Sequence, residues 1–170
     1  MASLMDNLVE VLEQENTWYE KLVSLSKDKK QAIIRADIAA LEDITGQEQD
    51  ISSELRNLDI RRDAVLKDMA DVLGKDMEEM TITKLIGYLD QQKEEQERLS
   101  KIRAKLLSSG NEMHEWNMRN QALLQQALEM VEFDLTLFKS MRQAPETANY
   151  DKNAYNTGDL LGNSGFDAKQ

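Results

Sequence analysis

Apolar residues recur every three or four positions over most of this chain, which is the spacing of one face of an α-helix. The first segment carries two adjoining stripes of this kind: Leu4, Leu8, Val11, Trp18, Leu22 and Leu25, and beside them Met5, Val9, Leu12, Tyr19 and Val23. Glu15 is a polar interruption in the first stripe. Two adjoining stripes make a wide apolar face, which favours a helix packed against two neighbours in a bundle.

A second helix is expected to begin at Asp37, because aspartate is a favourable N-cap residue and basic residues precede it. Its apolar positions are Leu41, Ile44, Ile51, Leu55, Leu58, Val65, Met69 and Val72. Glu48 and Arg62 interrupt the pattern, and Gly74 suits the position that follows a helix end. Either Thr81 or Thr83 is suited to cap a short helix through Leu85, Ile86 and Leu89, before the acidic run 90–97.

A third long helix is expected from residue 99 to residue 142. Its heptad positions are Leu99, Ile102, Leu106, Met113, Trp116, Asn120, Leu123, Ala127, Met130, Leu137 and Met141, with interruptions at Ser109 and Asp134. Beside them runs a second stripe: Leu124, Leu128, Val131, Leu135 and Phe138. We expect most of this broad face to be core, because a large exposed apolar patch favours aggregation. A bundle of three long helices can still leave one groove for an amphipathic helix of another protein.

These elements predict an all-α fold, an elongated antiparallel helical bundle or coiled coil of three long helices plus one short helix, over residues 1–142. At 143 the composition changes to asparagine and glycine, and the only proline is Pro145. Residues 143–170 are therefore predicted to be a flexible tail. The tail also contains Tyr155, Leu160, Leu161 and Phe166. Two interpretations stay open: the tail orders on a partner, or it is an unstructured end.

The charge and the N-terminal sequence narrow the class of protein. A net charge of -11 disfavours nucleic acid as a partner, because such binding rests on neutralised phosphates. Asp6, Glu10 and Glu13 precede the first lysine, Lys21, which is the reverse of a secretory signal. No segment approaches the roughly 18 apolar residues of a membrane span. We therefore expect a cytoplasmic protein with no membrane insertion.

Candidate catalytic and metal-binding residues are few. With no cysteine, the chain has no thiol nucleophile and no disulfide. His114 is the only histidine, whereas a carboxylate-bridged di-metal bundle needs two Glu-x-x-His pairs, and Asn111 stands three residues before it. The glycines at 158, 162 and 165 have no Gly-Lys-Ser/Thr sequence beside them. The sequence thus predicts no enzyme, no cofactor and no metal, with His114 on the surface or in a helix seam.

Asn117 and Asn120 stand out in the third helix, because Asn120 occupies a heptad position otherwise held by apolar residues. A polar residue at one seam position can fix the register of a bundle at some cost in stability. The amides can instead bind a partner helix laid beside this one. Both interpretations stay open.

Three passages of the sequence resemble one family. They are LVEVLEQENTWYEKLVSLSKDKKQAIIRADIAALEDIT, QDISSELRNLDIRRDAVL, and the most telling, NMRNQALLQQAL, an Asn-x-x-Asn followed by paired leucines. Together with Tyr155, Gly158 and the acidic, glycine-rich end, their order resembles the FlgN-type flagellar export chaperones of the flagellar type III secretion system. The resemblance covers nearly the whole chain.

The resemblance implies a non-enzymatic chaperone that binds the C-terminal helical ends of FlgK-type and FlgL-type hook-associated proteins before export. It implies that the C-terminal part of the chain binds the substrate. The partner-binding residues expected on the third helix are Asn117, Asn120, Leu123, Leu124, Leu128, Val131, Leu135 and Phe138. In the tail, Tyr155, Leu160, Leu161 and Phe166 are expected either to contact the same substrate or to dock on the export gate.

A structural coiled-coil adaptor is the competing hypothesis, because the same heptads can serve permanent self-association. A chaperone predicts a monomer or weak homodimer with an open surface for a helical substrate. A structural coiled coil predicts a stable oligomer that leaves no such surface open.

Overall fold

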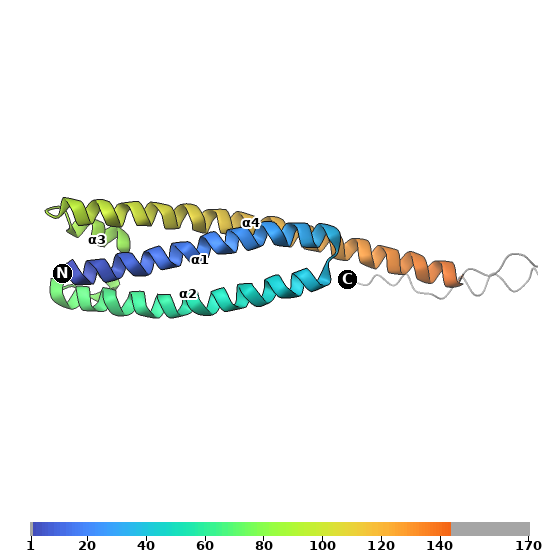
Figure 1. Cartoon of the computed structure of the whole chain (residues 1–170), viewed down its shortest axis with the longest axis horizontal. Helices are drawn as coiled ribbons and strands as arrows, with labels where there is room; N and C mark the ends of the chain where they lie inside the picture. Colours follow the sequence, from blue (N-terminus) through green and yellow to red (C-terminus); the bar gives the residue numbers. More distant parts are fainter. Residues whose placement is uncertain (1, 144–170) are drawn as a thin grey trace, which may run out of the picture. The chain divides into compact units, whose positions relative to one another are not determined.

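The computed structural model describes residues 2–143, where every regular element is helical. Three long α-helices, α1 (Ala2–Arg35), α2 (Ile38–Leu73) and α4 (Lys93–Gln143), accompany the 3₁₀ turn η1 (Met77–Glu79) and the short helix α3 (Ile82–Tyr88) (Figure 1). These elements confirm the predicted all-α class. The chain divides into two compact units, Met1–Glu129 and Met130–Gln170. The predicted tail beyond Gln143 lies outside the described residues.

The helix ends follow from single residues that the sequence singles out. Asp37 caps α2 by accepting a hydrogen bond from the backbone N–H of Ala40 at 3.0 Å, and Thr81 caps α3 by accepting one from Lys84 at 3.2 Å. Gly74 ends α2 with a φ of 62°, in the left-handed region that glycine adopts freely. All three capping predictions are confirmed. The third long helix begins at Lys93 rather than 99, so Glu94 and Glu95 lie in its first turn, where acidic side chains are favourable.

The three long helices alternate in direction within the first unit. The earlier α1 residue, Glu15, contacts the later α2 residue, Arg62, and the later α1 residue, Lys29, contacts the earlier α2 residue, Glu48. The two helices are therefore antiparallel. Three hydrogen bonds between α1 and α4 join residues 92 to 94 positions apart, so α4 is parallel to α1. In Figure 1, α1 lies between α2 and α4.

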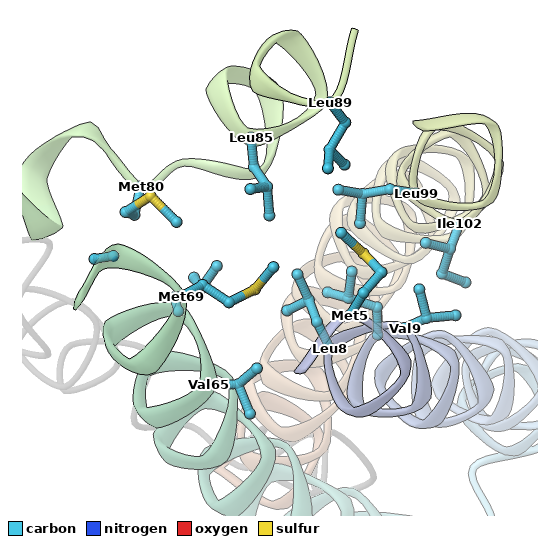
Figure 2. Close-up of a cluster of buried hydrophobic side chains, with 13 residues drawn as sticks. Met5, Leu8, Val9, Val65, Met69, Met80, Leu85, Leu89, Leu99 and Ile102 are labelled. Atoms are coloured by element: carbon cyan, nitrogen blue, oxygen red, sulfur yellow. The ribbon is translucent and has the colours of Figure 1, made fainter. Parts of the chain in front are cut away.

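One hydrophobic cluster brings all four α-helices together. Met5 and Leu8 of α1, Met69 of α2, Leu85 of α3 and Leu99 of α4 are all fully buried in it. Figure 2 shows Met80, Leu85 and Leu89 facing Met69 and Leu99, so that α3 closes the space between α2 and α4.

A second cluster involves α1 and α2 alone. Its buried members are Leu25, Ala32, Ile44 and Ile51. In α4, the residues that pack in the hydrophobic core end at Ile102 and the half-buried Leu106. Beyond that point, polar side chains of α4 form hydrogen bonds with α1.

Candidate partner-binding surface

The polar residues that interrupt the apolar stripes pair with one another across the helices. Arg62 Nη1 donates hydrogen bonds to Glu15 Oε1 and Oε2 at 2.9 and 3.0 Å, and its Nη2 lies 2.9 Å from Asp59 Oδ1. Lys29 Nζ donates to Glu48 Oε2 at 3.1 Å. Each predicted interruption in α1 and α2 therefore has a charged partner on the opposite helix, which satisfies it and fixes the register of the hairpin.

Glu15 is the most buried of these charged residues, with 2% of its surface exposed. Burial raises the pKa of its carboxyl group above the ordinary value of 4.5, because removal from water penalises the charged form. Arg62 opposes this rise, and the nearby carboxylates of Asp59 and Asp63 add to it. Burial also raises the pKa of the neighbouring Tyr19, with the Glu15 charge as a second cause.

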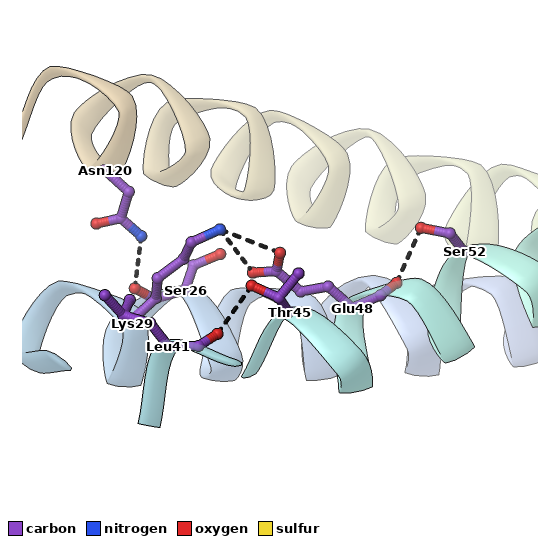
Figure 3. Close-up of polar contacts among 7 residues, drawn as sticks. All are labelled: Ser26, Lys29, Leu41, Thr45, Glu48, Ser52 and Asn120. Atoms are coloured by element: carbon purple, nitrogen blue, oxygen red, sulfur yellow. Dashed lines mark hydrogen bonds and ion pairs between the residues drawn. The ribbon is translucent and has the colours of Figure 1, made fainter. Parts of the chain in front are cut away.

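Two polar contacts connect α4 to α1. Ser109 Oγ donates to Asn16 Oδ1 at 2.8 Å, and Asn120 Nδ2 donates to the backbone oxygen of Ser26 at 2.7 Å. Figure 3 shows Asn120 reaching Ser26 next to the Lys29–Glu48 pair. Asn120 is 4% exposed, and its Oδ1 has no hydrogen-bond partner among the described residues. This placement favours the structural interpretation of Asn120.

The other residues predicted to bind a partner lie nearer the surface. Asn117 is exposed and Leu123 is half-buried. We call the five apolar residues of the second stripe, Leu124, Leu128, Val131, Leu135 and Phe138, the α4 stripe. All five are exposed, by 40% at Leu124 and 56% at Phe138. Seven of the eight predicted residues are therefore exposed or half-buried, and Asn120 is buried.

The expectation that most of this broad face is core is wrong. In the first unit, Leu124 and Leu128 are exposed. In the second unit, the described helical residues expose the rest of the α4 stripe together with Met130, Phe133, Leu137 and Met141. In the first unit, the last hydrogen bond between α1 and α4 joins Ser26 to Asn120, and Leu124 and Leu128 follow it in the sequence. An apolar stripe in the sequence shows which face of a helix is apolar, but it does not show how much of that face other helices bury.

The structure also contains a hollow that the sequence did not single out. Its lining comes from α1 (Tyr19, Leu22, Ser26), α2 (Glu48, Ser52, Leu55) and α4 (Met113, Asn117). Several of these residues belong to the heptad stripes that predicted the helices. The periodicity marked them as inward-facing, and only the arrangement of the helices leaves them uncovered.

Other chemistry is limited in the described part of the chain. His114 is exposed, which matches the surface position expected for it. Residues 2–143 contain no group of three or more histidine, aspartate or glutamate side chains that could hold a metal ion. None of the described helices combines the length and apolar character needed to cross a bilayer.

Comparison with known proteins identifies one family. A family model described as FlgN protein matches residues 1–158. No curated protein and no solved structure matches the chain.

Proposed function

The chain belongs to the FlgN family of flagellar export chaperones, since the family model covers residues 1–158, and from this membership we propose that it binds FlgK-type and FlgL-type hook-associated proteins. The bound part is their C-terminal helical ends, held in the cytoplasm before export. The chaperone prevents premature self-association of the unassembled subunit and helps deliver it to the flagellar type III export apparatus.

The exposure of the α4 stripe is the observation that carries the proposal. Leu124 and Leu128 are one helical turn apart, as are Val131 and Leu135, so each pair lies on one face of α4. Exposed apolar residues at this spacing form the docking face for an amphipathic helix. Methionines at 118, 130 and 141 of the same helix are exposed and adapt their shape to a partner.

In the proposed complex, a helix of the chaperone takes the place of the helix of a neighbouring filament subunit. Terminal helices of subunits that assemble into a filament carry apolar seams, which self-associate when left uncovered. A chaperone helix that covers such a seam removes this apolar surface from water. The net charge of -11 keeps the complex soluble through mutual repulsion.

The tail residues Tyr155, Leu160, Leu161 and Phe166 lie outside the described residues. We keep for them the two roles expected from the resemblance, contact with the same substrate or with the export gate. The free protein is proposed to be a monomer or a weak homodimer.

A structural coiled-coil adaptor is the second candidate, because an exposed apolar stripe also suits a second copy of the chain. The two candidates differ in the size of the free protein. A stable, concentration-independent oligomer in light scattering supports the adaptor, whereas a monomer that binds substrate peptides supports the chaperone.

The test is a substitution in the α4 stripe. Leu128 is 53% exposed in the first unit, so Leu128→Asp is expected to leave helicity and melting almost unchanged. A leucine buried in an interface contributes about 1.5–3 kcal/mol, so the Kd for a peptide with the C-terminal helix of a FlgK-type protein should rise roughly tenfold or more. Calorimetric titration measures the Kd.

Ile60→Asp is the matched control, because Ile60 is 65% exposed on α2. It should bind the peptide as the wild type does. A Leu128→Asp protein with wild-type affinity contradicts the proposed surface, and one that loses its helicity places Leu128 in a folding role. A wild-type protein that binds no peptide from either hook-associated protein contradicts the proposed function itself.

A further inference from the structure

A groove runs along the first unit between α2 and α4, with α1 as its floor. One hollow of about 290 Å³ is lined by Leu12, Glu15 and Tyr19 of α1, Arg62 of α2, Ile82 of α3, and Arg103, Leu106, Leu107, Gly110 and Met113 of α4. The hollow of about 360 Å³ described above shares Tyr19 and Met113 with it. The two hollows therefore lie next to each other, and we describe them together as one groove.

α3 shows what kind of element fits there. At the N-terminal end of α1, Leu85 of α3 and Leu89, the residue that follows α3, pack between α2 and α4, above Met5 and Leu8 (Figure 2). Ile82, the first residue of α3, lines the end of the groove. The same space thus holds a helix at one end of the unit and lacks one along the rest.

The α1 residues on the floor of the groove continue the same heptad positions that α3 covers at the end of the unit. Met5, Leu12, Tyr19 and Ser26 follow one another at steps of seven residues along α1. Met5 and Leu12 are buried in the cluster that α3 completes, whereas Tyr19 lines the open hollow. From Leu12 to Ser26 the groove extends about 21 Å, or about four helical turns, at the usual rise of 1.5 Å per residue.

We propose that this groove receives the C-terminal helix of the substrate, which lies end to end with α3 and completes a four-helix bundle with α1, α2 and α4. The inference rests on the proposed function and adds a second contact surface to the α4 stripe. The two surfaces are continuous on α4, because Arg103, Gly110, Asn117 and Leu124 follow one another at steps of seven residues on one helix face.

The charge at the α3 end of the groove sets the direction of the bound helix. Arg62 lies there, but its charge is compensated by Glu15, with which it forms an ion pair at 2.9 Å. Arg103 lines the same end, and its described partner is the uncharged Thr83 hydroxyl, to which Nε donates at 3.1 Å. At the other end, Glu48 is paired with Lys29. A helix is negative at its C-terminus. The substrate C-terminus, with its carboxylate, therefore lies beside Arg103, antiparallel to α4.

Gly110 provides a direct test, because it lines the groove and a Cβ added there meets no atom within 4 Å. Gly110→Trp fills the groove, and replacing glycine inside a helix favours the helical state. Gly46→Trp is the matched control, since Gly46 lies inside α2, is exposed, lines neither hollow and also has no atom within 4 Å of an added Cβ. Circular dichroism checks that both variants keep their helicity and melting midpoint.

The probe is a synthetic peptide of about 20 residues with the C-terminal helix of a FlgK-type protein, long enough for four turns. The expected result is a Kd raised at least tenfold by Gly110→Trp and unchanged by Gly46→Trp. Wild-type affinity in Gly110→Trp overturns the groove but leaves the function standing. An equal loss of affinity in both variants overturns the proposed groove as well. A wild-type protein that binds no peptide overturns the proposed function.

Two further measurements test the occupant and its direction. Arg103→Gln should weaken the binding of the free-acid peptide more than that of a C-terminally amidated peptide, and equal effects on the two overturn the direction. Light scattering tests whether a second copy fills the groove. A wild-type dimer that Gly110→Trp dissociates overturns the substrate as the occupant.

Discussion

At the scale of single residues, buried polar groups decide how the helices align. Glu15, Glu48 and Ser109 interrupt apolar stripes, and each meets a polar partner on another helix. A buried charge without a partner is costly, so a shift by one turn in either helix pair separates these groups and is disfavoured. The same residues that weaken the apolar pattern therefore specify one register.

Glu15 makes the stability of the protein depend on pH. Its pKa is raised in the folded protein, chiefly by burial, so the folded state holds this proton more tightly than the unfolded chain does. Its stabilising contribution is present below the ordinary pKa of 4.5 and is lost as the pH rises through the raised value. We expect the free energy of unfolding of the wild type, relative to Glu15→Gln, to fall as the pH rises from below 4.5 towards neutrality.

Urea unfolding of both proteins over this range measures the difference. The subtraction removes the titration of the other carboxylates, which the two proteins share. A difference that grows with pH would mean that the attraction of Arg62 outweighs the burial of Glu15.

Asn120 leaves one polar atom unsatisfied inside the protein. An unpaired buried acceptor costs about 1–3 kcal/mol, and the backbone oxygen of Ser26 lies within a helix that supplies its own hydrogen bonds. Asn120→Leu is therefore expected to raise the free energy of unfolding by about 1 kcal/mol. Asn117→Leu, at an exposed position, should change it by less than about 0.5 kcal/mol.

Denaturant titration of the two leucine variants tests this difference. Peptide binding then separates the two interpretations of the Asn-x-x-Asn pair. Unchanged affinity in Asn120→Leu assigns this residue to folding, and a large loss of affinity with unchanged stability assigns it to the substrate.

At the scale of elements, capping chemistry makes the helix ends predictable. Asp37, Gly74 and Thr81 stop or start helices through local hydrogen bonds and backbone geometry, which depend on neighbouring residues in the sequence. The start of α4 is less predictable, because its first turn is acidic and polar and carries no apolar stripe. α4 itself consists of a part in the hydrophobic core and a part beyond it.

This division of α4 predicts unequal local stability. Leu99 is fully buried, so Leu99→Ala should lower the free energy of unfolding by about 2–5 kcal/mol. Leu123 is half-buried, and Leu123→Ala should cost less than about 1 kcal/mol. Hydrogen exchange should show stronger protection of the amides at 96–106 than at 113–129. Uniform protection along α4 would contradict this division.

At the scale of the whole molecule, the two proposed surfaces follow from how much of α4 the other helices cover. α3 is too short to fill the space between α2 and α4, which leaves the groove, and the described helices leave the α4 stripe exposed. A protein with a net charge of -11 can expose this apolar surface and stay soluble. Both surfaces suit a chaperone that holds a helical substrate for a limited time.

The sequence by itself determined the helices, most of their ends and the apolar face of each, because periodicity and capping act over a few residues of one chain. The residues NMRNQALLQQAL and the order of the helices also pointed to the family that the comparison identifies. Only the tertiary structure decided that Asn120 is buried, that Leu128 is exposed and that Tyr19 lines a groove. Burial depends on which other helices lie beside a residue, and no local pattern in α4 determines that arrangement.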